Sequence, residues 1–334
     1  MCKKNARKVQ TFLYFSCTIG KLLLPLHPKR EISIMLSVII CTYNREKYIR
    51  PLLESLAAND LPKNEYEILL VDNNCTDNTR AVCGEFSKDH PGLTFRYMTE
   101  PEQGLSAARN KGIREAKGSI LVYVDDDALV DPHYLRDYAE HFASHPKTMA
   151  AGGPIIPLYE TEEPKWMTPY TKALLTGWMD FGRHMRHYPQ GRYPGGGNAA
   201  YRKEVFDKVG LFNTSLGRKG GSLMGSEEKD IFDKMHAQGM EVMYLPEPVL
   251  HHIIPQTKLE ESYFRRLTLQ IGMSERMRTK AISPAKYRKR LISEAVKWAG
   301  TLGLCCLYTL AFQPQKGLKL IRFRRNVTRG LLSA

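Results

Sequence analysis

Three consecutive aspartates, Asp125, Asp126 and Asp127, follow the apolar run Ile120–Val124. Three carboxylates so close together repel one another unless a cation or solvent lies between them. Two oxygen ligands at positions i and i+2 suit a hard divalent ion that keeps some waters and also takes substrate phosphates, as Mg²⁺ and Mn²⁺ do. An ordinary acidic turn that leads to a helix cap at Asp131 explains the same residues without a metal. The triplet alone therefore leaves both interpretations open.

Polar residues also follow two earlier apolar runs of the chain. They are Thr42-Tyr43-Asn44-Arg45 after the first run and Asp72-Asn73-Asn74 at the end of the second. The carboxyl ends of neighbouring parallel strands lie at one edge of a sheet, and ligands bind beyond that edge, near a topological switch point. The three polar clusters together therefore predict one binding site.

The elements that must position these residues alternate between strand and helix. The strand candidates are 36–41, 66–72, 93–99 and 119–125, and the helix candidates between them are 46–58, 77–88 and 105–116. Continuous apolar strands such as Ile68–Val71 predict burial on both faces, as in a parallel sheet covered by helices. The pattern predicts a doubly wound, mostly parallel α/β sheet with helices on both faces. No GxGxxG motif follows the first strand, which disfavours a Rossmann-type dinucleotide fold.

The order of elements becomes mixed after Asp127. A proline-rich connection leads to a glycine-rich strand over 195–201, and a helix is expected over 202–209. The segment 217–225 contains four glycines and is expected to be a mobile loop that closes over a bound ligand. A strand pair around 242–245 and 248–252 and long helices to the C-terminus complete the pattern.

Four segments resemble the conserved blocks of the family 2 glycosyltransferases, in the same order. They are Ser37–Arg45, Val71–Thr79, Gly104–Gly112 with Arg109-Asn110, and Val124–Asp127, which resembles the DxD motif. The resemblance continues more weakly through Gly196–Tyr201 and Glu227–Asp230 to His251, and ends after about residue 280. It implies a GT-A fold, a nucleotide-sugar donor, a Mn²⁺ or Mg²⁺ ion and inversion at the anomeric carbon.

The resemblance also implies roles for residues on the donor side. Asp72 matches an aspartate that accepts from N3–H of uracil or thymine, which favours UDP or dTDP. Asp127 is expected to be the direct metal ligand, Asp125 to reach the ribose or a metal-bound water, and His251 to approach the metal or the diphosphate. Arg109 is placed to pair with the diphosphate or to order the acidic loop. The remaining residues expected at the donor nucleotide are Thr42, Tyr43, Asn44, Arg45, Asn74 and Asp126.

A displacement that inverts the sugar also needs a base for the acceptor hydroxyl. The family places an acidic pair at the start of a later helix, and here that segment reads Glu227-Glu228-x-Asp230. A helix N-terminus favours the ionised carboxylate, so Glu228 is the expected base and Glu227 the alternative. Acids placed only to complement the helix dipole would give the same pattern. Asp230, Asn198 and Gly197 are expected near the sugar or the acceptor, because glycines let the backbone approach a ligand closely.

Three regions follow from the pattern. Residues 1–34 resemble a leader that is not part of the native protein, with Met35 as the expected start. Residues 35–255 are expected to form the catalytic domain, divided into a nucleotide-binding half (35–130) and an acceptor half (131–255). Residues 256–334 are expected to form a C-terminal helical extension.

The formal net charge of +14 is concentrated at the two ends of the chain. Residues 1–34 carry seven Lys/Arg against one acid, 276–290 carry seven with no acid, and six more follow Phe312. No zinc-finger spacing or RNP-like aromatic run accompanies this charge, so we expect no nucleic-acid partner. Residues 299–312 lack charge but are too few to span a membrane.

The basic flanks of this uncharged run favour peripheral membrane contact through 286–334 over burial in the protein. Seven cysteines without a CxxC pair favour a reducing compartment. We therefore expect a cytoplasmic enzyme at the inner face of the cytoplasmic membrane, which acts on a glycan or a lipid-linked glycan in surface polysaccharide or lipid-linked glycan assembly.

Two other classes of protein compete with a glycosyltransferase. A nucleotidyltransferase also uses an α/β sheet and paired acids, but it needs a glycine-rich basic loop after the first strand, which Thr42–Arg45 is not. A membrane-surface binding protein without catalytic activity would explain the basic tail but not the ordered polar strand ends.

Overall fold

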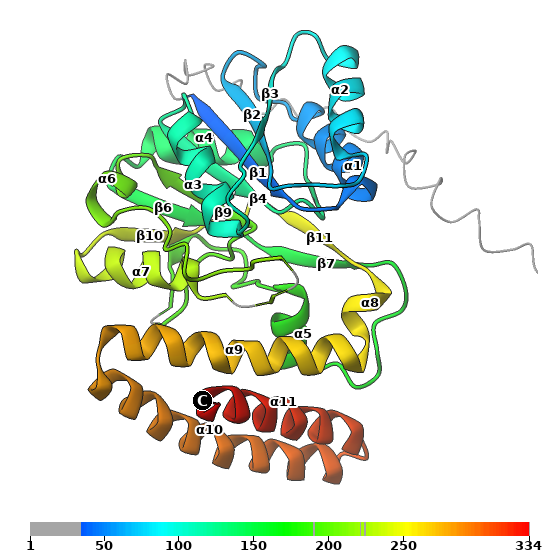
Figure 1. The fold of residues 1–334 in the computed structure, drawn as a ribbon, viewed down its shortest axis with the longest axis vertical. Helices are drawn as coiled ribbons and strands as arrows, with labels where there is room; N and C mark the ends of the chain where they lie inside the picture. The colour runs from blue at the N-terminus through cyan, green and yellow to red at the C-terminus, as the bar shows by residue number, and fades with distance from the viewer. Residues whose placement is uncertain (1–34, 190, 221, 224, 334) are drawn as a thin grey trace, which may run out of the picture. The chain divides into compact units, whose positions relative to one another are not determined.

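The computed structural model describes residues 35–189, 191–220, 222–223 and 225–333. The predicted leader lies outside these residues. Within them, eight strands form one sheet in the order β3-β2-β1-β4-β9-β6-β10-β8, and β9 and β8 run antiparallel to their neighbours (Figure 1). In chain order the strands are β1 (Leu36–Thr42), β2 (Tyr66–Asp72), β3 (Thr94–Thr99), β4 (Ile120–Val124), β6 (Thr148–Gly152), β8 (Arg186–His187), β9 (Asn198–Arg202) and β10 (Glu241–Tyr244).

Helices cover both faces of this sheet because its central strands are apolar on both sides. All residues of β2 and β4 are buried, and alternate side chains of β1 enter two separate cores. One core is completed by α1 (Glu46–Ala57), α2 (Thr79–Asp89) and α4 (Tyr134–Ser144), and the other by α3 (Leu105–Glu115), α6 (Val205–Val209) and α7 (Glu227–Ala237).

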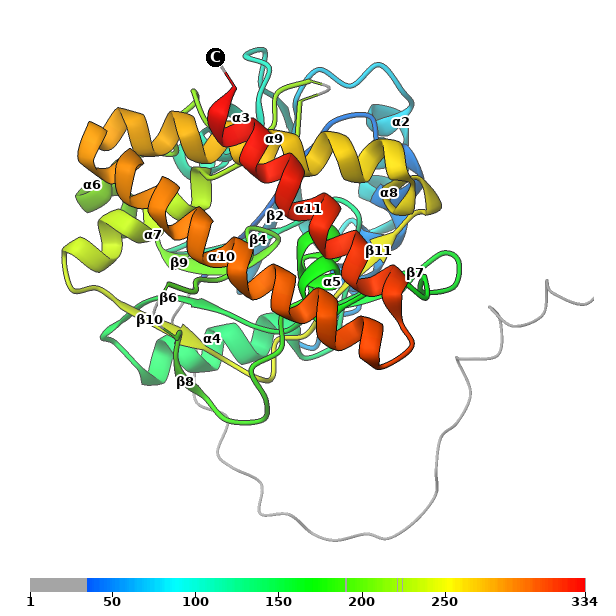
Figure 2. The ribbon, with the colours of Figure 1, turned by 90° about the horizontal axis from the view of Figure 1, so that it is seen from below.

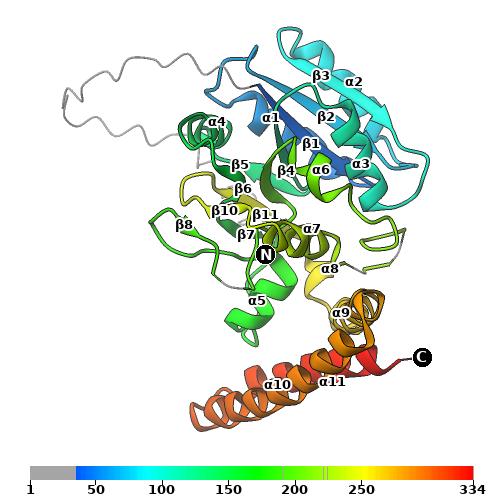
Figure 3. The same cartoon turned by 90° about the vertical axis from the view of Figure 1, so that its left-hand side faces the viewer.

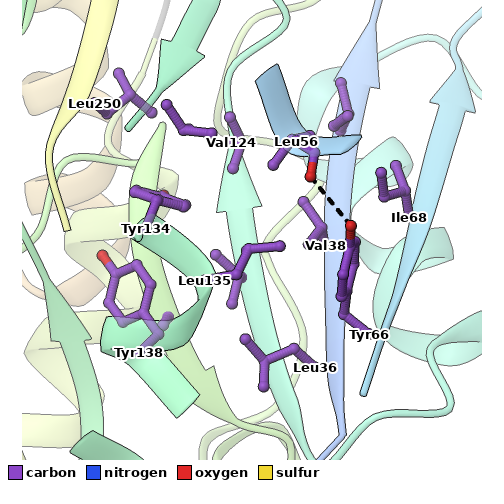
Figure 4. Packing of buried hydrophobic residues seen from close by; sticks show 14 of the residues in the cluster. Leu36, Val38, Leu56, Tyr66, Ile68, Val124, Tyr134, Leu135, Tyr138 and Leu250 are labelled. Carbon is purple, nitrogen blue, oxygen red and sulfur yellow. Dashed lines mark hydrogen bonds between the residues drawn. The ribbon is translucent and has the colours of Figure 1, made fainter. Parts of the chain in front are cut away.

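Figure 4 shows the first of these cores at close range. Val38 of β1 lies between Leu135 of α4 and Ile68 of β2, and the hydroxyl of Tyr66 donates to the carbonyl of Leu56 at 3.1 Å. This bond satisfies a buried phenol that apolar packing alone would leave unpaired. The central strands are therefore held firmly, and their carboxyl ends are a rigid base for a site.

A second sheet of three strands lies next to the aspartate triplet. Its order is β5-β11-β7, formed by β5 (Ala128–Val130), β11 (Leu250–Ile254) and β7 (Ile155–Tyr159). The antiparallel register of β5 and β11 sets His252 opposite Ala128, the first residue after Asp127. This pairing brings a segment from far along the chain to the aspartates.

Helices make up the C-terminal part of the chain. They are α8 (Gln256–Leu259), α9 (Glu261–Ile282), α10 (Pro284–Leu310) and α11 (Pro314–Leu332); the short α5 (Pro169–Thr176) precedes them in the chain. Figures 1 and 3 show α10 and α11 on the side of α9 that faces away from the large sheet, and Figure 2 shows α11 crossing between α9 and α10. The approach of α11 to α9 is close, because a Cβ on Gly330 would stand 2.0 Å from the carbonyl oxygen of Leu269.

The structure confirms the predicted α/β class with C-terminal helices, and it corrects three local predictions. The glycine-rich strand begins at Asn198 rather than at residue 195, and the following helix covers only Val205–Val209. The strands near 242–245 and 248–252 do not pair with each other, since β10 belongs to the large sheet and β11 to the small one. None of the helices in the described part of the chain combines the length and the apolar character that a membrane crossing requires.

Candidate active site

Two adjacent cavities open at the carboxyl ends of β1 and β4. The first, here called the aspartate cavity, has a volume of about 180 Å³ and is lined by Asp125, Asp126 and Asp127 together with Thr42, Tyr43 and Arg45. The second, the glutamate cavity, has a volume of about 580 Å³ and contains Glu227 and Glu228. Asp125, Arg218, His252 and Lys258 line both cavities. Asp125 at the end of β4 therefore faces the same cavity as Glu227 and Glu228 at the start of α7.

Asp127 lies between His252 of the small sheet and Lys258 of α8. Its Oδ1 is 3.0 Å from Nε2 of His252, and its Oδ2 accepts from Nζ of Lys258 at 2.7 Å. Burial opposes ionisation of this carboxyl, but Lys258 and His252 outweigh it and hold the pKa well below its usual range. Asp127 is therefore an anion at neutral pH. A metal ion that binds its carboxylate would have to share that carboxylate with Lys258.

The position of the histidine differs from the prediction made from the sequence. Nε2 of His251 is 3.0 Å from Asp131, and the side chain of His251 lines neither cavity. Its neighbour His252 faces Asp127, because the register of β11 with β5 directs every second side chain toward the triplet. The structure therefore places His252 beside the aspartates, where His251 was expected.

The other two aspartates also line the aspartate cavity, and both are less buried than Asp127. Burial, followed by repulsion from Asp127, raises the pKa of Asp126 to about 7. Asp125 packs against the backbone of Gly197, where an added Cβ would stand 2.2 Å from its Oδ2. Glycine at 197 therefore lets Asp125 reach the space that both cavities share.

These residues fit a divalent ion whose remaining ligands come from the substrate and water. They do not by themselves fill the coordination shell of such an ion. The described residues contain no group of three or more His, Cys, Asp or Glu side chains that could hold a metal ion. Mg²⁺ and Mn²⁺ sites often use one or two carboxylates and take their other ligands from phosphates and water. Asp127 and Asp125 supply that number, provided that Lys258 gives up part of its contact with Asp127.

The base candidate Glu228 is held by an arginine from another element. Arg109 of α3 is buried, and its Nη1 is 2.8 Å from Oε1 of Glu228 and 3.0 Å from Oε1 of Glu227. Gly196 packs directly against this group, since a Cβ there would lie 1.9 Å from Oε1 of Glu228. Arg109 thus orders the acidic pair at the start of α7.

The two glutamates differ in protonation. Burial, followed by the charge of Glu228, raises the pKa of Glu227 to about 8, so that Glu227 is mostly protonated at neutral pH. Burial acts in the same direction on Glu228, but Arg109 more than offsets it and lowers the pKa of that carboxyl. The side chain of Glu228 is also 20% exposed, against 3% for Glu227. Glu228 is thus the ionised acid that faces the cavity.

Several residues expected at the nucleotide instead hold the loops around the cavities. The carboxylate of Asp72 accepts from the backbone N–H of Cys75 and from the hydroxyl of Tyr97, and it does not line the aspartate cavity. The side chain of Asn44 accepts from the N–H of Thr76, and that of Asn74 donates to the carbonyl of Pro101. Their neighbours Asn73 and Gln103 line the aspartate cavity, although we did not predict them there.

Asn198 and Asp230 also have other partners. The side chain of Asn198 accepts from the hydroxyls of Tyr134 and Tyr138, and it donates to the carbonyls of Pro154 and Pro248. All four of its hydrogen-bonding positions are used inside the core. Asp230 pairs with Lys234 at 2.7 Å. The structure gives Asn198 a structural role instead of the predicted contact with the sugar.

Arg218 and Lys258 are the main residues of the site that the sequence did not reveal. Arg218 lies in the glycine-rich segment before α7, and its backbone carbonyl accepts from the N–H of Leu105 at 2.8 Å. Lys258 lies in the four-residue helix α8 and is buried beside Asp127. The sequence offered one signal for Arg218, which is that Arg218 and Lys219 lie among glycines shortly before the acidic pair.

The sheet order, the small sheet beside it and the acids at the end of β4 define the GT-A fold of glycosyltransferases. Residues 37–210 match the model of glycosyl transferase family 2, and the chain therefore belongs to this family and is a glycosyltransferase. The predicted family is thereby confirmed, and the membership decides against a nucleotidyltransferase and against a purely membrane-binding protein.

Curated relatives cover most of the chain at low identity. The glucosyl-dolichyl phosphate glucuronosyltransferase of Haloferax volcanii is 26% identical over 246 residues, which is 72% of this chain and 76% of that protein. The succinoglycan biosynthesis protein ExoM of Rhizobium meliloti is also 26% identical over 246 residues, covering 72% and 74%.

Solved structures show the same fold. The mannosyltransferase PcManGT from Pyrobaculum calidifontis, in complex with GDP-Man and Mn²⁺, aligns with a TM-score of 0.57 at 18% identity and covers 88% of this chain and 87% of that one. TarS 1–349 of S. aureus, in complex with UDP-GlcNAc, aligns with a TM-score of 0.53 at 20% identity. That alignment covers 72% of this chain and 66% of TarS 1–349. At these identities the likeness shows the fold alone.

Proposed function

We propose that this glycosyltransferase transfers a sugar from a nucleoside diphosphate sugar to an acceptor hydroxyl, with inversion at the anomeric carbon. The observation that carries the proposal is the ionised Glu228, held by Arg109 in a cavity that it shares with Asp125. The acceptor oxygen forms the new bond to the anomeric carbon while the bond to the diphosphate breaks. Glu228 takes the hydroxyl proton, and the nucleoside diphosphate leaves with the electron pair.

The groups around Asp127 suit the departing diphosphate. A Mn²⁺ or Mg²⁺ ion held by Asp127 and Asp125 would offset the charge that develops on the leaving group. Lys258 and Arg218 of this chain add positive charge on the same side of the site, where both line the two cavities. The metal-bound relative PcManGT supports this arrangement through its fold and its Mn²⁺.

We propose further that the donor carries UDP or dTDP as its nucleotide. This proposal rests on Asp72, whose carboxylate has to leave Tyr97 to reach a pyrimidine. The solved relatives include one complex with UDP-GlcNAc and one with GDP-Man, so the fold accepts both kinds of base. A panel of nucleotides therefore decides the question.

The test is a thermal-shift screen of nucleoside diphosphates and nucleotide sugars, with and without Mn²⁺. We expect one nucleoside diphosphate to raise the melting temperature most, and Mn²⁺ to enlarge that shift in the wild type but not in Asp127→Ala. The variant Asp131→Ala, at a half-exposed aspartate outside both cavities, serves as the matched control. No shift with any nucleotide, with or without the ion, would overturn the proposal.

We also propose that the acceptor is a glycan or a lipid-linked glycan and that the enzyme works at the inner face of the cytoplasmic membrane. The two curated relatives, named for a dolichyl phosphate-linked substrate and for succinoglycan biosynthesis, support this class of acceptor. The exposed side of α10 supports the membrane surface, because it carries an uncharged stripe at helical spacing. Its members are Ile292, Val296, Ala299, Gly303, Cys306 and Leu310.

The occupant that fits this stripe is an anionic lipid surface. Val296 is 70% exposed, Leu310 is 76% exposed and Phe312 at the end of the helix is 93% exposed. No acid follows Glu294, whereas seven Lys/Arg do. Two copies of such a basic surface would repel each other, but anionic headgroups would attract it.

Sedimentation with vesicles tests this surface. We expect the wild type to bind vesicles that contain phosphatidylglycerol and Leu310→Glu to bind them at least several-fold more weakly. The matched control Leu158→Glu changes an apolar residue that is 46% exposed in β7, away from the stripe, and should bind like the wild type. Equal binding of Leu310→Glu and the wild type would refute the membrane role of α10.

A further inference from the structure

The glutamate cavity extends far beyond the acids that define it. It runs from Glu228 and Asp125 to the C-terminal helices, where Arg290 and Lys297 of α10 and Arg324 of α11 line it. The 580 Å³ volume is within the range of small-molecule sites in proteins. The C-terminal helices, which the family match over 37–210 does not include, thus form one wall of the candidate active site.

This wall is positively charged even after its ion pairs are counted. Arg290 contacts Glu275 at 3.4 Å and Glu294 at 2.7 Å, and Arg324 contacts Glu294 at 3.1 Å. Both glutamates are therefore shared between cations, and Lys229 and Arg278 also pair with Glu275. Arg278 reaches one further acid, Asp233, at 2.7 Å. With Lys297, five cations thus surround three carboxylates.

Lys297 is the cation in this group that no acid neutralises directly. Its ammonium has no hydrogen-bond or ion-pair partner within the described part of the chain, although it lines the cavity. Partial burial and then the neighbouring Arg290 lower the pKa of Lys297, and they outweigh Glu294 and Glu275, which act in the opposite direction. Lys297 is an exposed residue of α10, so water solvates its ammonium when the cavity is empty, and an anion that enters the cavity meets a charge that no acid already holds.

Apolar side chains lie along the same cavity. Leu267 and Ile271 of α9 and Phe323 and Val327 of α11 line it next to the cations. A ligand that fills this space therefore needs an anionic group and a surface of lower polarity, such as a hydrocarbon chain or the apolar face of a sugar. The donor diphosphate has its own cations, Lys258 and Arg218, beside the aspartates.

We infer that the glutamate cavity is the acceptor site and that Lys297, with Arg290 and Arg324, binds a phosphate group that the acceptor carries. This inference rests on the proposed function, since it assumes that Glu228 activates the acceptor hydroxyl at the other end of the cavity. The acceptor class is accordingly a phosphorylated glycan, in which phosphate and reacting hydroxyl are separated by part of the cavity's length. A lipid-linked sugar phosphate and a soluble phosphorylated glycan share this chemistry.

Binding of three probes to the full-length protein tests the inference. The probes are decyl phosphate, inorganic phosphate and decyl glucoside, measured by calorimetry with UDP present to occupy the nucleotide side. The test variant is Lys297→Gln, which breaks no ion pair with a described residue. The matched control is Lys286→Gln, the same charge change on an exposed residue of α10 that does not line the cavity.

We expect Lys297→Gln to weaken decyl phosphate binding by about 10-fold, since a charge-assisted hydrogen bond to the phosphate is lost. Decyl glucoside should bind both proteins equally, and Lys286→Gln should match the wild type. Tighter binding of decyl phosphate than of inorganic phosphate points to a lipid-linked acceptor, and equal binding to a soluble one. Wild-type affinity for decyl phosphate in Lys297→Gln, or an equal loss in Lys286→Gln, overturns the inference.

Nucleotide binding separates this inference from the proposed function. If UDP and every other nucleoside diphosphate fail to bind the wild type, the proposed function fails whatever the phosphate probes show. If a nucleoside diphosphate binds Lys297→Gln and the wild type equally while decyl phosphate does not distinguish them, only the acceptor site is refuted.

Discussion

The most specific prediction concerns Gly196, which the structure places against the base candidate. A Cβ at this position would stand 1.9 Å from Oε1 of Glu228 and 2.6 Å from Nη2 of Arg109. Ordinary van der Waals contact begins at 3.4 Å, so the carboxylate oxygen in Gly196→Ala has to move by about 1.5 Å. A displacement of about 1 Å in a catalytic group costs roughly 100-fold in rate, or about 2.7 kcal/mol in the activation free energy.

The assay is steady-state sugar transfer, combined with calorimetry of nucleoside diphosphate binding. We expect kcat of Gly196→Ala to fall by about 100-fold, while nucleotide affinity stays near that of the wild type because Gly196 does not line the aspartate cavity. The matched control is Gly225→Ala, where the nearest atom to the added Cβ is Oε2 of Glu227 at 3.8 Å. A folded Gly196→Ala enzyme with wild-type kcat would refute the close contact on which the base assignment depends.

Three further substitutions test the charges of the site. Glu228→Gln should lower kcat by about 100-fold or more without changing nucleotide affinity, and wild-type turnover in a steady-state assay would remove the base assignment. Glu227, whose pKa is raised from 4.5 to about 8, stabilises the folded state in its protonated form, and this stability is lost as pH rises through about 8. Melting temperatures between pH 6 and pH 9 should therefore fall less in Glu227→Gln than in the wild type, and parallel curves would contradict the raised pKa. Lys258→Met removes the ammonium that pairs with the buried Asp127 at 2.7 Å. It should lower the free energy of unfolding by about 3 kcal/mol, and Mn²⁺ should restore part of this loss. Urea unfolding that matches the wild type would show that the Asp127–Lys258 pair does not form.

The sequence predicted the parts of the fold that depend on local pattern. Strands β1, β2 and β4 were located closely because their apolar runs reflect burial on both faces of the sheet. The aspartate triplet could be placed at the carboxyl end of β4 for the same reason, and the family resemblance then located the acidic pair at the start of α7. These predictions needed only the residues next to one another in the chain.

The errors lie where distant segments meet. Whether His251 or His252 faces Asp127 depends on the register of β11 with β5, and a shift of one residue reverses every side chain of the strand. Lys258 reaches the site from a four-residue helix that has no periodic pattern. Asn198 stands beside three glycines in the sequence, but its side chain accepts hydrogen bonds from two tyrosines of α4 inside the core. No local pattern carries this information.

Real-time proton NMR of the transfer reaction tests the central claim most directly. The donor is the nucleotide sugar that stabilises the protein most, and one spectrum follows both the released nucleoside diphosphate and the anomeric proton of the product. The account predicts release of the nucleoside diphosphate together with a product whose anomeric configuration is opposite to that of the donor. A product of unchanged configuration would contradict a single displacement with Glu228 as the base.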